Sequence, residues 1–375
     1  MDSPLSDDFW SHLGFTRINP GMKRTILALP FALLAVTGCV EEEPILGEDT
    51  AGLGVFDGNG DPCPKLGCGS NSAHLGPAEF HELDETRTQA NLEGFRITGF
   101  KKSGSTLDYR LDVTGTTLTG QLNWFGTWVT ALSGQGLAGS TIYLVGPGGV
   151  KYSLLIAGVT SQTMWQAPLV QIETYQLRWK FTDYDYGWQD QPVCVDPPNR
   201  YEGEWQLWNS ITEAILFTGD RYDTNALEID SVGPSSWFNI ACAGTVMAKL
   251  ALNRHTSATQ TSSFPTTLDQ RQAMLKMYTS DVCHNGDALT VTGTKLRWAS
   301  SNGLSSPVIP VNSLEAAWGK DGAICLSTHR LNGTADDMDS QIAASCNVQG
   351  LTRPPPCTFE LMSGAYLITT SPALP

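Results

Sequence analysis

The chain has few basic residues, no long apolar segment and none of the common catalytic motifs. Among its 375 residues, 23 are Lys or Arg and 38 are Asp or Glu, a formal net charge of −15. A surface this acidic repels phosphate backbones and disfavours nucleic acid as a partner. The patterns Gly-x-Ser-x-Gly, His-Glu-x-x-His and Gly-x-x-x-x-Gly-Lys-Ser/Thr do not occur. The usual signs of a serine hydrolase, a zinc protease and a phosphate-binding loop are therefore missing.

The apolar run over residues 26–36 is short, because as a helix it reaches only about 16 Å of a bilayer core roughly 30 Å thick. It follows Lys23 and Arg24 and ends in small residues before Cys39, which is the order of a secretory signal. The closing Val-Thr-Gly-Cys looks like a bacterial lipobox, whose cysteine is acylated and becomes the new N-terminus. We therefore predict a removed lipoprotein signal peptide over residues 22–38 and lipidation of Cys39.

The segments on either side of this signal follow from it. Residues 1–21 place three aspartates ahead of the basic segment, so we expect a misannotated upstream extension with Met22 as the true start; a long n-region is the alternative. Residues 39–61 are rich in Glu and Gly, which predicts a flexible acidic tether. Val40 follows the lipidated cysteine in place of a retaining aspartate. The expected location is the bacterial cell envelope, lipid-anchored at the outer membrane.

The mature chain exceeds one average domain, and two are expected. In residues 62–190, apolar and polar side chains alternate from Leu107 to Val113 and from Tyr175 to Phe181. A period of two marks strands with one buried face, and Gly-rich breaks such as residues 146–149 mark turns. This half is predicted to be a β-sandwich or barrel-like domain.

Residues 191–375 have a mixed pattern. Thr267 and Gln270 fit a capping box, and the apolar face that follows predicts a helix over about 268–281. Further elements are predicted, namely a short helix over 337–346 and strands over 289–291 and 296–298. The predicted fold class is β-rich α+β, with the β domain followed by a disulfide-stapled mixed domain with one or two short helices.

Nine cysteines are present, and eight remain once Cys39 is lipidated. An even number in an exported chain predicts up to four disulfides. The candidates are Cys63, Cys68, Cys194, Cys242, Cys283, Cys325, Cys346 and Cys357. Short loops favour Cys63 with Cys68 and Cys346 with Cys357, and elimination leaves Cys283 with Cys325 and Cys194 with Cys242.

Several phrases of this sequence point to a family. They include Met277-Tyr278-Thr279-Ser280-Asp281-Val282-Cys283, Gly293-Thr294-Lys295-Leu296-Arg297-Trp298, Ala241-Cys242-Ala243-Gly244 and Leu314-Glu315-Ala316-Ala317-Trp318-Gly319. Their order and spacing resemble the ADYC domain family of exported, myxobacteria-like bacterial lipoproteins, over nearly the whole mature chain. The name-giving Ala-Asp-Tyr-Cys is here Ser280 to Cys283, which keeps only the acid and the cysteine. The resemblance implies an exported domain of uncharacterised function, with no catalytic residues.

Cys283 stands next to His284, and an adjacent base can activate a thiol nucleophile. An oxidised cysteine cannot attack a substrate, so we favour a disulfide at this position. Asp281 is expected to hydrogen-bond near the helix end.

The candidate metal sites and catalytic acid pairs each have a simpler, non-catalytic interpretation. Cys63, Cys68, His74 and His81 could form a zinc set, but export favours a disulfide. Residues 57–61 begin like a calcium loop that then lacks its glycine and its bidentate Glu. Paired acids for glycoside cleavage could come from two places, namely Asp183 with Asp185 or Glu202 with Glu204. Neighbouring acids arise by chance in so acidic a chain, and we predict no metal, cofactor or catalytic residue.

Aromatic residues cluster after the strand over 175–181. Tyr184, Tyr186 and Trp188 alternate with acids, and exposed rings beside polar groups suit sugar stacking; packing in the core is the alternative. The predicted function is a surface lipoprotein acting as a non-enzymatic envelope binding or structural module. The alternative is an extracytoplasmic enzyme acting on polysaccharide or cell wall through paired carboxylates. Expected partners are the membrane, through the lipid on Cys39, and a glycan or envelope protein.

Overall fold

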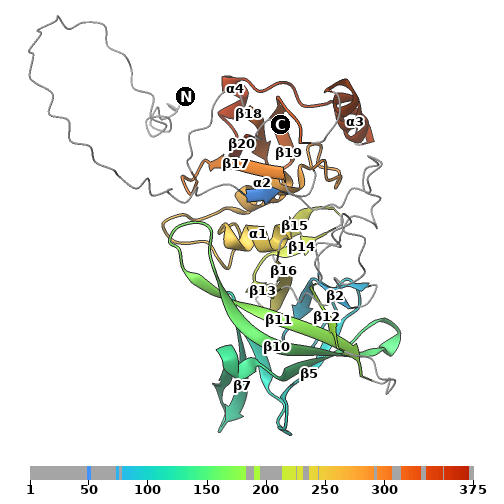
Figure 1. Cartoon of the computed structure of the whole chain (residues 1–375), viewed down its shortest axis with the longest axis vertical. Helices are drawn as coiled ribbons and strands as arrows, with labels where there is room; N and C mark the ends of the chain where they lie inside the picture. Colours follow the sequence, from blue (N-terminus) through green and yellow to red (C-terminus); the bar gives the residue numbers. More distant parts are fainter. Residues whose placement is uncertain are drawn as a thin grey trace, which may run out of the picture. The chain divides into compact units, whose positions relative to one another are not determined.

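The described part of the chain is a β-rich α+β fold (Figure 1), as the sequence predicts. The computed structural model describes residues 49–51, 73–75, 78–182, 190–194, 213–224, 226–230, 236–243, 245–290, 294–305, 314–330, 335–348 and 350–370. All of these belong to the compact unit Gly47–Pro375. The predicted leader and the lipidation site Cys39 lie outside the described residues.

An eight-stranded sheet is the largest element. Its strand order is β4-β16-β13-β11-β10-β9-β5, with β12 paired to β11, and neighbouring strands run antiparallel. The strands are β4 (Glu82–Asp84), β5 (Arg96–Lys102), β9 (Ser140–Val145), β10 (Lys151–Thr163), β11 (Gln171–Phe181), β12 (Gln191–Pro192), β13 (Glu213–Thr218) and β16 (Trp237–Cys242). The path ends at β4 and β5, so this sheet is open and not a closed barrel.

A three-stranded sheet, β6-β7-β8, contacts the larger sheet through β5 and β13. Its strands are β6 (Arg110–Thr114), β7 (Thr117–Trp124) and β8 (Thr127–Ser133). Alternate side chains of β6 and β7, such as Leu111 and Leu118, are fully buried against Phe100 and Tyr175 of the larger sheet. We call this apolar interior the sheet core. The predicted alternation from Tyr175 to Trp179 is confirmed, because every second residue is buried there.

A third sheet combines the N-terminal strand β1 with four strands of the C-terminal part, in the order β1-β17-β20-β18-β19. Its strands are β1 (Asp49–Ala51), β17 (Thr294–Ser300), β18 (Leu314–Gly319), β19 (Gly322–Leu326) and β20 (Leu367–Thr370). Two short hairpins complete the β structure, β2 (His74–Leu75) with β3 (Ala78–Glu79), and β14 (Arg221–Asp223) with β15 (Glu228–Asp230). The strand predicted over 296–298 is confirmed by β17, whereas Leu289 and Thr290 are not in a strand.

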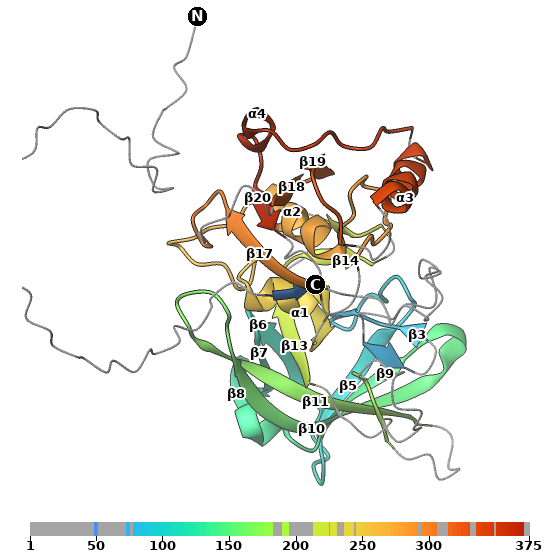
Figure 2. The same ribbon diagram turned by 45° about the horizontal axis from the view of Figure 1, so that its top comes forward.

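The described residues form four α-helices. They are α1 (Val246–Leu252), α2 (Leu268–Thr279), α3 (Ala335–Val348) and α4 (Phe359–Met362). The first, α1, contacts β13 and β16, while α2 contacts α1 and the strands β18, β19 and β20 (Figure 2). Around them lies a second apolar interior, the helix core, which includes Met247, Met274, Tyr278, Trp298 and Trp318.

Both predicted helices are confirmed. The Thr267 hydroxyl accepts the Gln270 N–H, and the Gln270 side chain accepts the Thr267 N–H, so the capping box at the start of α2 is complete. The helix ends two residues before the predicted limit, since Ser280 adopts a left-handed conformation (φ 53°). The C-terminal helix α3 extends beyond the predicted limits at both ends and buries Met338 and Ile342.

Strand β13 belongs to both interiors. Ala214 and Leu216 face the sheet core, whereas Ile215 and Phe217 face the helix core, as the alternation of a strand buried on both faces requires. The eight-stranded sheet thus contains strands from both sides of the domain boundary predicted at residues 190 and 191.

Among the described residues, no helix combines the length and the apolar character needed to span a bilayer.

Candidate functional site

The turn after α2 carries the motif Ser280 to Cys283, and its acid is fully buried. Asp281 receives the Lys276 ammonium at 2.5 Å, and both side chains are 0% exposed. Its carboxylate also accepts the backbone N–H groups of Asn285 at 3.0 Å and Gly286 at 3.2 Å. Every contact of this acid ties the turn to the helix end, so its role here is structural, and the expected hydrogen bonding near the helix end is confirmed.

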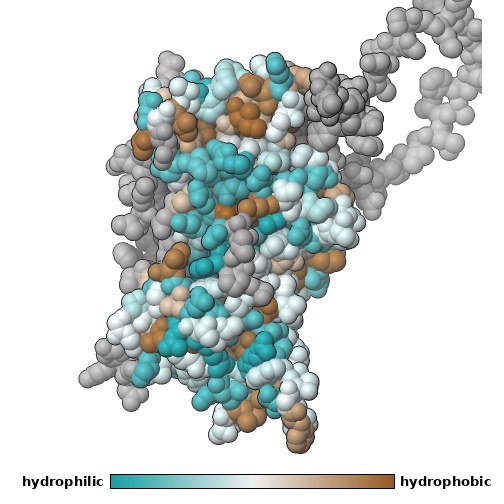
Figure 3. All heavy atoms as spheres, turned by 180° about the vertical axis from the view of Figure 1, so that it is seen from behind, coloured by the Kyte–Doolittle hydropathy of each residue, from teal (hydrophilic) through white to brown (hydrophobic). Residues whose placement is uncertain are grey.

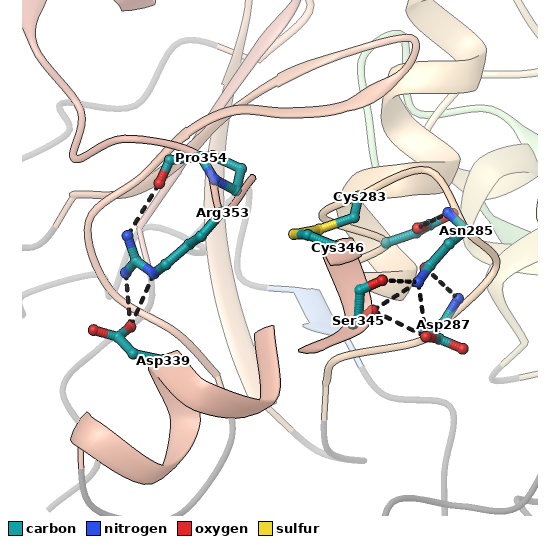
Figure 4. The surroundings of a disulfide bond; sticks show 9 residues. Cys283, Asn285, Asp287, Asp339, Ser345, Cys346, Arg353 and Pro354 are labelled. Carbon is teal, nitrogen blue, oxygen red and sulfur yellow. Dashed lines mark hydrogen bonds and ion pairs between the residues drawn. A yellow bond between two sulfur atoms is a disulfide. The ribbon is translucent and has the colours of Figure 1, made fainter. Parts of the chain in front are cut away.

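The cysteine of the same motif is oxidised. Cys283 is bonded to Cys346 on α3, with Cα atoms 5.0 Å apart (Figure 4). Beside the disulfide, the Asn285 amide donates to Ser345 Oγ at 2.7 Å and to Asp287 Oδ2 at 2.8 Å. Because its thiol is consumed, Cys283 cannot act as the nucleophile that its neighbour His284 suggests.

Two of the predicted disulfide pairings are wrong. Cys194 pairs with Cys242 as predicted, but Cys283 pairs with Cys346 and Cys325 pairs with Cys357. Loop length gave the wrong pairs because tertiary contacts bring cysteines together that are distant in the sequence. The segment before Cys357 lies along β19, where the Leu326 N–H donates to Pro355 O at 2.9 Å and the Cys357 N–H to Ser327 Oγ at 3.0 Å. Cys63 and Cys68 lie outside the described residues.

Most of the other predicted sites also lie outside the described residues. This holds for Tyr184, Tyr186 and Trp188, for the acids Asp183, Asp185, Glu202 and Glu204, and for the loop over 57–61. In the same aromatic stretch, Trp179 is 7% exposed and Phe181 packs against the sheet core, so these two rings are core residues. His81 is buried, with its Nε2 at 2.7 Å from Tyr222 O. The described residues contain no group of three or more His, Cys, Asp or Glu side chains placed to hold a metal ion.

Several titratable groups have shifted pKa values, and among them are His255 and Glu85, whose residue types serve as acids or bases. Burial lowers the pKa of His255 to about 4. Its Nδ1–H donates to Asn253 O at 2.8 Å, and its ring meets Trp298 edge to face. Burial raises the pKa of Glu85 to about 7, although its carboxylate accepts the Val113 N–H at 2.8 Å. The contacts of both groups are structural, and neither is hydrogen-bonded to a nucleophile.

The clearest surface feature is the tip of the β7–β8 hairpin. Phe125 is 94% exposed at the apex, flanked by Trp124 at 65% and by Trp128 at 45%. Figure 1 places this hairpin at the lower end of the described part, and apolar side chains reach that end in Figure 3. We call Trp124, Phe125 and Trp128 the aromatic tip. Large apolar side chains gathered on a surface mark contact sites more often than single ones do.

The turn at this tip places a bulky residue in an unfavourable conformation. Phe125 and Gly126 join the paired residues Trp124 and Thr127, and both have positive φ, 49° and 89°. The Asn123 side chain accepts the Gly126 N–H at 2.7 Å. Two-residue turns of this kind favour Asn or Gly at the first position, and a left-handed bulky residue is an outlier. The turn keeps a phenylalanine at the apex against this preference.

The sequence around the tip contains no charged residue. No Asp, Glu, Lys or Arg occurs between Asp112 and Lys151, although the chain carries 61 such residues in total, 23 basic and 38 acidic. A cation from β6 lies beside the tip: the Arg110 guanidinium is 5.3 Å from the centre of the Trp128 ring and 4.0 Å from the Asp112 carboxylate. The sequence signal was therefore present, as a Trp-Phe-Gly turn inside a long neutral stretch. Sequence reasoning missed it because the acid-flanked aromatics over 184–188 resembled a sugar site more closely.

Comparison with known proteins identifies one family. The family model described as ADYC domain matches residues 134–332, more than half of the chain. The match begins directly after β8, so the β7–β8 hairpin precedes the matched segment. No curated protein and no solved structure matches the chain.

Proposed function

The chain belongs to the ADYC domain family, and on that premise we propose that it is a non-enzymatic binding or structural module of the bacterial cell envelope. The lipid on Cys39 anchors it at the outer membrane, and the folded unit presents the β7–β8 hairpin as its contact surface.

The observation that carries this proposal is the exposure of the aromatic tip on a rigid support. Phe125 and Trp124 are mostly open to solvent, while the strands behind them bury Leu111 and Leu118 in the sheet core. A contact surface held by a packed β scaffold loses little entropy on binding. The acid of the Ser280 to Cys283 motif, Asp281, is used in structural contacts with Lys276 and Asn285. This use favours a binding role over a catalytic one.

Expression of the full chain in a Gram-negative host, followed by membrane fractionation and mass spectrometry, tests this function. We expect a mature chain that begins at an acylated Cys39 and sediments with outer membranes. Cys39→Ala is the matched control and should lose the lipid. Intact residues 1–38 with an unmodified Cys39 would contradict the anchor.

A second assay separates binding from catalysis. The purified chain is incubated with peptidoglycan and with envelope polysaccharide, and soluble fragments are measured. We expect none above the level of heat-unfolded protein. Sustained release of fragments would replace the binding role with the enzymatic alternative.

A further inference from the structure

We propose that the aromatic tip is a second membrane contact, in which Trp124, Phe125 and Trp128 insert into the interfacial layer of a phospholipid bilayer. This inference rests on the proposed function, since a lipid anchor on Cys39 would bring the hairpin to a membrane surface. It goes further by naming the partner of the hairpin.

The first argument is where the exposed aromatic rings lie. The three rings occur within five residues, on both sides of one turn. Elsewhere in the described residues, the exposed large apolar side chains occur singly or in pairs, such as Leu169 at 57% with Val170 at 45%, and Phe359 is the one aromatic ring among them. Trp is enriched at membrane–water interfaces, and Trp and Phe both occur on the lipid-facing side of interfacial segments, so these side chains suit the end of a hairpin that meets lipid.

Second, the hairpin carries no charged side chain. A bilayer interior penalises every charged side chain that enters it, and the neutral stretch between Asp112 and Lys151 contains the whole hairpin. The rest of this acidic chain is repelled by anionic headgroups. A neutral projection is therefore the part of the surface best suited to approach lipid.

The third argument is the position of Arg110. It pairs with Gln121, three residues before Trp124, which corresponds to about 10 Å along the strand. Interfacial segments typically bury their apolar face about 5–10 Å deep. With the tip inserted, the Arg110 guanidinium beside Trp128 lies at the level of the lipid phosphates, where a cation is favourable. Its ion-pair partner Asp112, at 4.0 Å, pairs with Thr119 and so lies two residues further from the tip along the strand.

Ring geometry favours a bilayer over a glycan. The Trp124 and Phe125 rings meet at 89°, with centroids 5.5 Å apart, so they form a convex wedge and not a flat platform for a sugar ring. A fluid lipid phase needs no matched platform. Phe125 is the first residue of the turn that joins Trp124 to Thr127, so its ring lies at the apex and enters lipid first.

Hydrogen exchange measured by mass spectrometry on the full chain tests this inference. The probe is vesicles of phosphatidylethanolamine and phosphatidylglycerol, and the readout is exchange in peptides covering residues 117–133. When most of the chain is vesicle-bound, we expect the tip amides to exchange about tenfold more slowly than in free chain. The Trp124→Ser/Phe125→Ser variant should lose this protection.

Leu92→Ser is the matched control, because Leu92 is 73% exposed, a value between those of Trp124 and Phe125, and lies outside the hairpin, before β5. It should keep full protection of the tip. Unchanged exchange of the core strands β10 and β11 in each variant verifies folding. Any contribution of the N-terminal apolar segment is common to all variants and cancels in the comparison.

The outcomes separate the two proposals. If the chain sediments with vesicles while the tip exchanges as fast as in free chain, the second contact is refuted and the envelope role stands. If neutral oligosaccharides slow amide exchange at the tip and vesicles do not, the partner is a glycan and the lipid inference is overturned. A chain that neither binds vesicles nor carries lipid on Cys39 refutes both.

Discussion

The sheet core and the helix core are built by different means. In the sheet core, long antiparallel strands such as β10 and β11 fix the register, and apolar side chains from the strands fill the interior. The helix core has shorter strands and contains ion pairs with no exposure at all, Lys276–Asp281 and Arg330–Glu315. The ion pairs at the edge of the sheet core keep one partner open to solvent, as Arg221 does with Glu82.

This difference shows how the segments around the helix core are held together. The Arg330 guanidinium contacts Glu315 and donates to Met277 O, so it joins β18, the loop after β19 and α2. Two disulfides, Cys283–Cys346 and Cys325–Cys357, add further links on this side. Where ladder hydrogen bonds are few, buried charges and covalent links specify which segments meet. The following predictions test that contrast.

Breaking a buried pair should have the largest effect. Asp281→Ala leaves the Lys276 ammonium and the N–H groups of Asn285 and Gly286 without their acceptor. We expect a loss of about 3–5 kcal/mol in the free energy of unfolding, measured by urea denaturation with disulfides intact. Asp339→Ala is the control, because its pair with Arg353 (Figure 4) is half-exposed and should cost under about 1 kcal/mol. Equal losses would show that burial does not matter here.

Acid should weaken the helix core through His255. Its folded pKa of about 4 lies below its ordinary 6.5, so between these values the unfolded chain binds a proton that the folded chain does not. Stability therefore falls as pH drops from about 6.5 to about 4, by roughly 3 kcal/mol. Urea unfolding at several pH values should show a flatter slope for His255→Gln across this window. A wild-type slope that persists in the variant would assign the effect to other groups.

The edge of the sheet core should respond to pH in the opposite direction. Burial raises the folded pKa of Glu85 to about 7 from 4.5, so the folded chain keeps a proton that the unfolded chain has released. Stability from this group is full below about 4.5 and is lost as pH rises to about 7. Since Glu85 is only partly buried, we expect a smaller effect than at His255. Glu85→Gln should remove the loss on the alkaline side, and an unchanged profile would contradict it.

The parts of the fold that depend on neighbouring residues could be predicted from the sequence. The capping box of Thr267 and Gln270 is complete within four residues, and the alternation from Tyr175 follows from one buried face. Both patterns are local, so no tertiary knowledge was needed.

The cysteine pairings and the exposed hairpin could not be predicted in the same way. Cys346 meets Cys283 only because α3 packs beside the turn after α2, a placement that no spacing rule encodes. Trp128 and Val129 occupy β8, where nearly every residue is exposed. A strand rich in Trp and Val is normally buried on one face, so sequence alone assigns these residues to a core. Their exposure depends on tertiary packing, because β6 and β7 contact the larger sheet through β5 and β13, and β8 is not among the strands that make these main contacts.

The smallest effect on stability is expected at the aromatic tip, and its sign separates folding from function. Phe125 has a φ of 49° at the first position of its turn, where asparagine is preferred. Phe125→Asn should therefore raise the free energy of unfolding by about 0.5–1 kcal/mol while it weakens the protection of the hairpin by vesicles. Phe125→Ala removes the same ring but does not introduce a residue that this turn position prefers. It should therefore lose the protection by vesicles with little gain in stability. If Phe125→Asn destabilises the chain, the ring serves the fold. If it stabilises the chain and keeps vesicle protection, the apex is not the contact.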